Sequence, residues 1–284
     1  MADARLLVVD DDPDIHVLLH KILGDTGCSI DSVTTGEQGL ARLQNGAYDL
    51  VLTDICMPGL SGLDLLQQIH KIRPDTKVVV MTAQNTSDNL LQAIRDHAFT
   101  YFSKPFSPAA LSDMIGRALE SPWASGDIEV LSARPNWIAL RLRCKMEIAE
   151  TLVQFFRELQ LGMTADEQAD IAMAFRELLM NAIEHGGHSD PNQKVEVAYI
   201  RTARAILYQV RDPGEGFSFE NLAHAAVSGT PDAPFRHVEV RSQAGMRPGG
   251  FGILMTRQVV DELIYNEKGN EVLLVKYLES EPRP

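Results

Sequence analysis

The polar pair with the clearest chemical potential in this sequence is Glu177 and Asn181, four residues apart in the stretch AFRELLMNAIEHGG at 174–187. On a helix this spacing places both side chains on one face, roughly 6 Å apart along the axis. A carboxamide oxygen suits Mg²⁺, and a nearby carboxylate can take a proton from an attacking hydroxyl. The pair can therefore serve one magnesium–phosphate site. The same sequence is also compatible with an ordinary amphipathic helix that has two polar residues on its solvent-exposed face.

A second set of polar residues follows apolar runs in the first half of the chain: Asp10, Asp11, Asp12, Asp54, Thr82 and Lys104. Several carboxylates repel one another unless a cation neutralises them, and an oxygen-only set suits Mg²⁺. With that charge neutralised, Asp54 can attack a phosphoryl group and Thr82 can hydrogen-bond its oxygens. Taken singly, the aspartates also fit a solvated helix start and Lys104 a surface charge. Their shared position after strand-like runs favours a site.

Two kinds of element alternate along residues 5–120 and would position these side chains. Short apolar runs predict strands at Arg5–Val9, Ser29–Val33, Asp49–Thr53, Lys77–Met81 and Thr100–Ser103. Helical patterns follow them, at Pro13–Leu23, Gly36–Gln44, Leu63–Lys71, Ser87–His97 and Pro108–Leu119. Strand–helix units of this length predict a parallel sheet covered on both faces. In such a sheet a ligand binds beyond the carboxyl ends of the strands, where the polar set lies.

Four motifs of this half are VVDDDPDI at 8–15, LTDICMPGLSGLDLL at 52–66, MTA at 81–83 and FSKPF at 102–106. Together they resemble the receiver domain of bacterial two-component response regulators, over about residues 4–120. The resemblance implies an α/β flavodoxin-like fold with strand order 2-1-3-4-5. It further implies that Asp54 is the phospho-acceptor and that Mg²⁺ is held by Asp10, Asp11, Asp54 and the backbone carbonyl of Cys56. The implied phosphate contacts and switch residues are Thr82, Lys104 and Tyr101. In this family the bond that corresponds to Lys104–Pro105 is commonly cis.

The alternation ends at SPWASG, residues 121–126, whose composition is typical of a short linker. We therefore predict a receiver domain at 1–120, a linker at 121–127 and a second domain at 128–284. The second domain contains extended runs and helical patterns: strands at Ile128–Leu131, Trp137–Leu142, Val195–Arg201, Ile206–Val210 and Glu271–Tyr277, and helices at Glu147–Leu159, Asp166–His185 and Phe251–Asp261. Helices and a mixed or antiparallel sheet in separate blocks predict an α+β two-layer sandwich.

A glycine-containing loop, DPGEGF at 212–217, follows one of these strands. Gly214 and Gly216 let the backbone approach a flat ligand closely, and Asp212 can accept a hydrogen bond from an exocyclic amine such as that of adenine. The same letters fit a plain turn.

About thirty residues rich in Ala, Ser, Gly, Pro and Arg come next, a length typical of a lid. Arg247 lies near their end and could meet a phosphate, or be a solvated surface arginine. Gly250 and Gly252 then open a helix, where backbone amides and the helix dipole favour phosphate oxygens.

The order of these features resembles the Bergerat (GHKL) ATP-binding fold, and within it the anti-sigma-factor serine/threonine kinases. The resemblance covers about residues 134–278 and rests on ELLMNAIEHG, DPGEGF, GGFGILMTRQVVDEL and YNEKGNEVLLVKYL. It implies ATP as co-substrate, Mg²⁺ as cofactor, Glu177 as general base and Asn181 as Mg²⁺ ligand. The ATP contacts it implies, with Arg247 added from the loop, are Asn181, Asp212, Gly214, Gly216, Gly250, Gly252 and Arg247.

Composition narrows the classes of partner. A formal net charge of -13 disfavours general binding to nucleic acid or to an anionic membrane. The three cysteines, Cys28, Cys56 and Cys144, lie far apart without metal or redox spacing, which predicts structural thiols in a reducing compartment. Neither a signal-peptide pattern nor a long apolar run is found, so we expect a cytoplasmic protein.

We therefore predict a response regulator in which phosphorylation of Asp54 controls an ATP-dependent protein serine/threonine kinase. The resemblances imply a cognate sensor histidine kinase, an anti-sigma-factor antagonist of STAS type as substrate and a sigma factor as a further partner, and are compatible with a homodimer. Two alternatives stay open: a non-catalytic ATP-binding anti-sigma switch, and a histidine-kinase-like protein acting in trans. Residues 121–160 contain no histidine, which disfavours a phospho-acceptor histidine directly before the ATPase domain.

Overall fold

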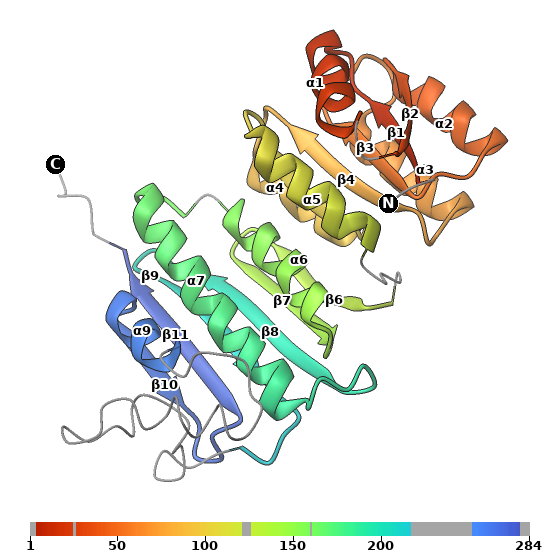
Figure 1. Cartoon of the computed structure of the whole chain (residues 1–284). Coiled ribbons are helices and arrows are strands. Elements are labelled where there is room, and N and C mark those ends of the chain that lie inside the picture. Colours follow the sequence, from red (N-terminus) through yellow and green to blue (C-terminus); the bar gives the residue numbers. More distant parts are fainter. Residues whose placement is uncertain (1–3, 25–26, 121–125, 160, 217–251, 279–284) are drawn as a thin grey trace, which may run out of the picture. The chain divides into compact units, whose positions relative to one another are not determined.

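The structure is a computed structural model that describes residues 4–24, 27–120, 126–159, 161–216 and 252–278. The chain divides into two compact units between Asp127 and Ile128 (Figure 1). Among the described helices we find none with the length and apolar character needed to cross a bilayer.

The first unit is built on a five-stranded parallel sheet with the order β2-β1-β3-β4-β5. Its strands are β1 (Arg5–Val9), β2 (Ser29–Val33), β3 (Leu50–Asp54), β4 (Lys77–Thr82) and β5 (Thr100–Ser103). The central strands read as nearly unbroken apolar runs because both of their faces are covered. Strand order and fold class agree with the prediction.

Five helices connect these strands: α1 (Pro13–Leu23), α2 (Gly36–Asn45), α3 (Gly62–Ile72), α4 (Ser87–Arg95) and α5 (Pro108–Glu120). Helix α1 contacts α5, whereas α2 contacts α3 and α3 contacts α4, so the helices form two groups. Four of them begin at a side-chain cap, in which an Asp, Ser or Thr oxygen accepts a backbone N–H of the first turn: Asp12, Thr35, Ser61 and Thr86.

The second unit is built on a six-stranded sheet with the order β10-β11-β9-β8-β7-β6, in which every neighbouring pair is antiparallel. Its strands are β6 (Ile128–Arg134), β7 (Trp137–Arg143), β8 (Lys194–Arg201), β9 (Ala205–Arg211), β10 (Glu262–Tyr265) and β11 (Glu271–Tyr277). The prediction missed β10, a four-residue strand directly after a helix. The two-layer α+β class is confirmed.

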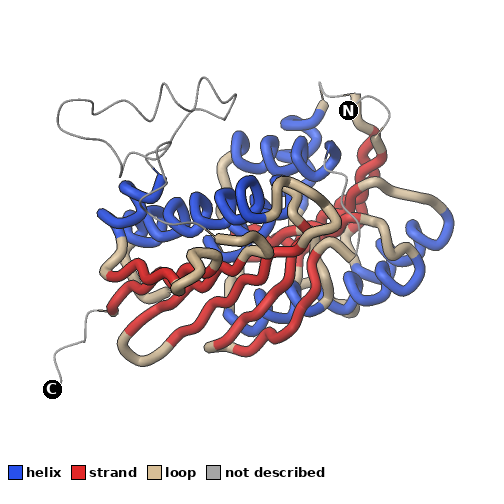
Figure 2. The backbone as a smooth tube through the Cα atoms, turned by 90° about the horizontal axis from the view of Figure 1, so that it is seen from below, coloured by secondary structure: helices blue, strands red, loops and turns tan. Residues whose placement is uncertain are grey.

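Three helices of this unit, α6 (Met146–Arg157), α7 (Ala165–Asn181) and α9 (Gly252–Val259), lie over one face of the sheet (Figure 1, Figure 2). Between the two layers, four aromatic rings pack with centroids 5.0 to 6.0 Å apart: Phe156, Phe175, Tyr199 and Tyr208. Strand β8 shows the alternation that one covered face requires, because Val195, Val197 and Tyr199 are buried in turn. This core fixes α7 against the sheet.

Helix α7 has well-defined ends. At its start, Thr164 and Glu167 form a capping box, in which each side chain accepts the backbone N–H of the other residue. At its end the helix widens into one π-helical turn, η1 (Ala182–Gly186), and Gly187 donates its N–H to the carbonyl of Ala182 at 2.8 Å. Such turns insert one residue into the helix and often occur at functional sites.

Candidate functional site

An ion-paired acidic cluster lies at the carboxyl ends of β1 and β3. The Nζ atom of Lys104 donates to Oδ2 of Asp10 at 2.7 Å and to Oδ2 of Asp54 at 3.0 Å. Carboxylate oxygens of Asp10, Asp11 and Asp54 lie within 4.8 Å of one another. Asp10 is fully buried and the Asp54 side chain is 10% exposed, whereas Asp11 is exposed. The cluster is therefore open on the side of Asp11.

The charges of this cluster are strongly coupled. Burial raises the pKa of Asp10, against the opposing effect of its hydrogen bond with Lys104. Burial alone would lower the pKa of Lys104, but its hydrogen bonds to both carboxylates raise the pKa overall. Two of the three carboxyl groups pair with the single ammonium group of Lys104 and the third does not, so the set fits a divalent cation that prefers oxygen ligands, such as Mg²⁺.

Backbone amides fix the orientation of both buried carboxylates. The Asp12 N–H donates to Oδ1 of Asp10 at 3.0 Å, and the Cys56 N–H donates to Oδ1 of Asp54 at 3.3 Å. The imidazole Nε2 of His16 lies 2.7 Å from the carbonyl oxygen of Asp10. Cys56, whose carbonyl was predicted as a ligand, thus lies directly beside Asp54.

Thr82 and Tyr101 lie on the neighbouring strands β4 and β5. Thr82 is fully buried at the end of β4; its Oγ1 accepts the Gln84 N–H at 3.0 Å, and its carbonyl accepts the Lys104 N–H at 2.7 Å. Tyr101 is fully buried, and the Lys104–Pro105 peptide bond is cis, as the resemblance suggested. The structure brings the predicted receiver residues to one edge of the sheet, except Tyr101, which lies two residues earlier along β5, opposite Val80.

Gly62, at the start of α3, was not predicted to matter and lies against Asp54. A Cβ atom at this position would be 1.9 Å from the Asp54 carbonyl oxygen, far inside contact distance. A side chain here would displace either α3 or the end of β3. The sequence signal was the Ser61–Gly62 pair at a helix start, but the close approach depends on tertiary structure.

The second candidate site lies along α7. Glu177 and Asn181 occur one turn apart in this helix, and both are half-buried. The preceding residue, Arg176, forms a two-pronged ion pair with Glu150 on α6. The helix thus holds both predicted residues on one face, on an element fixed by its neighbours.

Asp212 packs against the end of the same helix. A Cβ atom on Gly186 would lie 2.2 Å from the carboxyl carbon of Asp212, so only glycine permits this contact. The Gly214 N–H donates to Oδ1 of Asp212 at 2.8 Å. Burial raises the pKa of Asp212, while the Gly214 hydrogen bond and the positive charge of Lys268 oppose the shift. A half-buried carboxylate acceptor therefore stands at one end of the helix that carries Glu177 and Asn181.

The turn between β10 and β11 supports this loop from the other side. Gly216 has a φ of +83°, and a Cβ atom on it would be 1.8 Å from the Lys268 carbonyl oxygen. The Nζ atom of Lys268 donates to the Gly214 carbonyl at 2.9 Å. At both glycines predicted in this loop, the backbone of another residue approaches closely. The contribution of Lys268 was not predicted.

The remaining predicted residues lie partly outside the described part of the chain. Gly250 and Arg247 are outside the described residues. Gly252 is the first residue of α9, which contacts α7.

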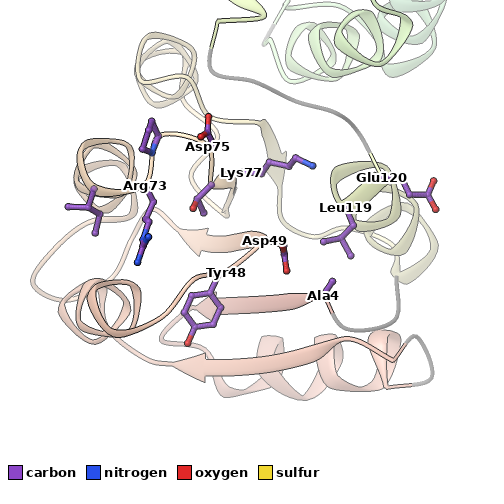
Figure 3. A pocket seen from close by; sticks show the side chains of 11 residues that line it. Ala4, Tyr48, Asp49, Arg73, Asp75, Lys77, Leu119 and Glu120 are labelled. Carbon is purple, nitrogen blue, oxygen red and sulfur yellow. The ribbon is translucent and has the colours of Figure 1, made fainter.

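A cavity of about 710 Å³ lies at the other end of the receiver sheet, where the strands begin (Figure 3). Its walls mix charges of both signs with apolar groups: Ala4, Tyr48, Asp49, Ile72, Arg73, Pro74, Asp75, Thr76, Lys77, Leu119 and Glu120. It shares no residue with the two predicted sites.

Comparison with known families gives two matches. Residues 6–116 match the family described as response regulator receiver domain, and residues 143–276 match the family described as histidine kinase-like ATPase domain. Both resemblances found in the sequence are confirmed at this level.

Several curated proteins and solved structures are similar to part of the chain. The DNA-binding transcriptional regulator NtrC of Azospirillum brasilense is 38% identical over 43% of this chain and 25% of its own length. The response regulator protein PilR of Pseudomonas aeruginosa is 34% identical over 50% of this chain and 33% of its own length. The chain thus spans a quarter to a third of these relatives. A CheY-like receiver domain structure from Methanospirillum hungatei is 32% identical, with a TM-score of 0.41, covering 42% of this chain and 95% of that protein.

Proposed function

We propose that this chain, which joins a response regulator receiver domain to a histidine kinase-like ATPase domain, uses the phosphorylation state of Asp54 to control an ATP-dependent protein serine/threonine kinase. The observation that carries the proposal is the α7 arrangement: Glu177 and Asn181 one turn apart, with Asp212 packed at the helix end. Each of these groups has one task in a phosphoryl transfer from ATP.

In the receiver, the chemistry is an attack by Asp54. One of its carboxylate oxygens forms a bond to the phosphorus of a phosphohistidine on a cognate sensor kinase, and the histidine nitrogen leaves. Asp10, Asp11, Asp54 and the Cys56 carbonyl would hold Mg²⁺, which neutralises the developing negative charge. Lys104 and Thr82 would bind the phosphoryl oxygens. Proximity of Lys104 to Asp54, at 3.0 Å, supports this assignment.

In the ATPase domain, Glu177 would act as the general base. Its carboxylate takes the proton of a serine or threonine hydroxyl while that oxygen bonds to the γ-phosphorus, and ADP leaves. Asn181 would hold the Mg²⁺ that accompanies the nucleotide. Asp212 would accept a hydrogen bond from the exocyclic amine of adenine, with Gly214 and Gly216 beside the nucleotide. Gly250, Gly252 and Arg247 are proposed to contact its phosphates.

The proposed substrate is an anti-sigma-factor antagonist of STAS type, and a sigma factor is a further proposed partner. Support comes from the motifs ELLMNAIEHG and DPGEGF, which resemble anti-sigma-factor kinases. Coupling to Asp54 follows from the presence of both domains in one chain, and couplings of this kind typically amount to about 1–3 kcal/mol.

The test is phosphoryl transfer by the purified full chain. Protein, Mg²⁺, labelled ATP and a STAS-domain protein from the same genome are incubated, and labelled serine or threonine is identified by peptide mapping. Glu177→Gln should lower the transfer rate by roughly 10²–10⁴-fold while ATP binding persists, since only proton removal is lost. Glu196→Gln, on strand β8, is the matched control and should transfer at the wild-type rate.

The negative results of this phosphoryl-transfer experiment distinguish between the alternatives. Transfer that is unchanged in Glu177→Gln would reject Glu177 as the base. Binding of ATP without transfer to any STAS-domain protein would favour the non-catalytic switch over the kinase.

A further inference from the structure

The hydrogen-bond ladder between β9 and β11 continues for one more residue into the turn between β10 and β11. In this extra pair, a side chain replaces one of the two backbone donors. The two strands pair as far as Arg211 and Glu271. One residue further, the Asp212 N–H donates to the Asn270 carbonyl at 2.9 Å. An antiparallel pair would return this bond through its own backbone N–H. Here the Asn270 carboxamide returns it instead, because Nδ2 donates to the Asp212 carbonyl at 3.1 Å.

Asn266 explains why the side chain of Asn270, and not its backbone N–H, donates this hydrogen bond. Its Oδ1 accepts the backbone N–H groups of Gly269, Asn270 and Glu271 at 2.8, 3.1 and 3.3 Å, so the Asn270 N–H is turned away from the loop. Its Nδ2 donates to Oδ1 of Asn270 at 3.0 Å. Since the oxygen of the Asn270 carboxamide faces Asn266, its NH₂ group faces Asp212. The orientation of one asparagine is therefore set by the other.

The site of contact is enclosed. Asn270 is only 7% exposed, and its Nδ2 also reaches the Gly214 carbonyl at 3.4 Å. The Asp212 carboxyl group packs against Gly186. A buried donor without a partner is costly, so the network favours one position of the loop. The asparagine pair thus holds the backbone of Asp212, while the carboxyl group of the same residue packs on Gly186 at the helix end.

We propose that Asn270, oriented by Asn266, is the positioning residue for Asp212 and thereby sets the preference for adenine over a 6-oxopurine. The inference rests on the proposed function, in which Asp212 accepts a hydrogen bond from the adenine amine. A fixed carboxylate meets an oxygen instead of an N–H when the base is hypoxanthine, and that pair repels. A loosened carboxylate can turn away, so discrimination falls.

The experiment measures the dissociation constants of the full chain for ATP and for inosine triphosphate, both with Mg²⁺. Asn270→Ala should reduce the ratio of the two constants about tenfold, mainly by weakening ATP binding, which corresponds to about 1.4 kcal/mol. Asn270→Asp keeps the size but replaces the donor by an oxygen, and should reduce the ratio at least as much. Glu267→Gln, exposed in the same turn, is the matched control and should keep the wild-type ratio.

A second pair of variants separates positioning from general damage. In an Asp212→Ala background, Asn270→Ala should change the ratio no further, because no carboxylate remains to be held. If Asn270→Ala does not fold, Asn266→Ser serves instead, since it keeps an oxygen acceptor for the turn and removes only the amide that orients Asn270. Its ratio should also fall.

Two results would overturn the inference. A wild-type ratio in the Asn270 or Asn266 variants, with a lost ratio in Asp212→Ala, would leave the proposed ATP site standing and reject the positioning role. A wild-type protein that binds neither nucleotide would reject both the proposed function and this inference.

Discussion

The two candidate sites are assembled in opposite ways. The receiver cluster draws its side chains from the ends of separate parallel strands, so sheet topology alone brings Asp10, Asp54 and Lys104 together. The second site lies along one helix and is completed by backbone contacts that only glycine allows, at Gly186 and Gly216. Charge pairing at the strand ends dominates the first site, in which Gly62 adds one close contact, whereas close packing dominates the second. Substitutions should therefore act through electrostatics in one and through shape in the other.

The largest effect is expected at Asp54. Asp54→Asn removes the nucleophile while keeping the size of the side chain, so phosphorylation by a small phosphodonor should be abolished. Incorporated phosphate can be measured by electrophoresis that retards phosphoproteins. Asp64→Asn, an exposed carboxylate on α3, is the control and should be phosphorylated as in the wild type. Phosphate on the Asp54→Asn protein would place the acceptor elsewhere.

Lys104→Met should show how far the receiver site depends on charge. The change leaves two largely buried carboxylates without their shared ammonium group, and loss of one partner from such a pair typically costs about 3–5 kcal/mol. Urea unfolding of the receiver in the presence of a chelator should show this loss. Added Mg²⁺ should restore part of it, since the ion replaces the missing positive charge.

Lys71→Met on the exposed surface of α3 is the control for Lys104→Met. Equal stability of Lys104→Met and the wild type in chelator would mean that the ion pair contributes little to folding. The contrast between electrostatic and packing sites would then lose its main support.

The same contrast explains what the sequence could and could not predict. The receiver residues were found because strand ends can be located from apolar runs, and the polar residue that follows each run then shares an edge of the sheet. Glu177 and Asn181 were found because helical spacing is fixed. Asn266 and Asn270 were missed, since their role depends on a turn between β11 and the four-residue strand β10, which has too few residues to show a periodic pattern.

Close approaches were also beyond prediction. Gly62 contacts Asp54, which lies eight residues earlier in the chain, and Gly186 contacts Asp212, which lies 26 residues further along the chain. A glycine at the start or end of a helix is already explained by the local backbone conformation. The sequence therefore does not indicate that the glycine also makes a close tertiary contact. Sites that depend on close packing are therefore harder to predict from a sequence than clusters of charged residues.

Cys144 offers a pH test of the packing site. Burial, with smaller effects from Asp190 and Asp212, raises the pKa of this thiol to about 11, from an ordinary value of 9.0. In the native protein at pH 8, its labelling by a thiol reagent should be about 100-fold slower than in denaturant from ionisation alone. The exposed Cys56 should label first. The Cys144 rate should then rise about tenfold per pH unit towards 11, as mass spectrometry of labelled peptides would show.

The same shift predicts an alkaline loss of stability. The folded state keeps this thiol protonated, whereas the unfolded chain releases the proton near pH 9, so the free energy of unfolding should fall between pH 9 and 11 by about 2–3 kcal/mol. Cys144→Ala should remove that part of the slope, and Cys56→Ala should keep it. Rapid labelling of Cys144 at pH 8 would show that the region around Gly187 is open.

The smallest effect is expected at the start of α7. Thr164→Ala removes the side-chain cap, which accepts the Glu167 N–H at 3.3 Å, and should lower the free energy of unfolding by about 1 kcal/mol. Hydrogen exchange at the first amides of α7 should accelerate, and Thr164→Ser should restore it. Nucleotide affinity should stay unchanged, because Glu177 and Asn181 lie several turns away in a segment fixed by packing on the sheet. Weaker binding in Thr164→Ala would instead mean that the helix moves as one body, and that its cap, as well as its glycine contacts, sets the geometry of the site.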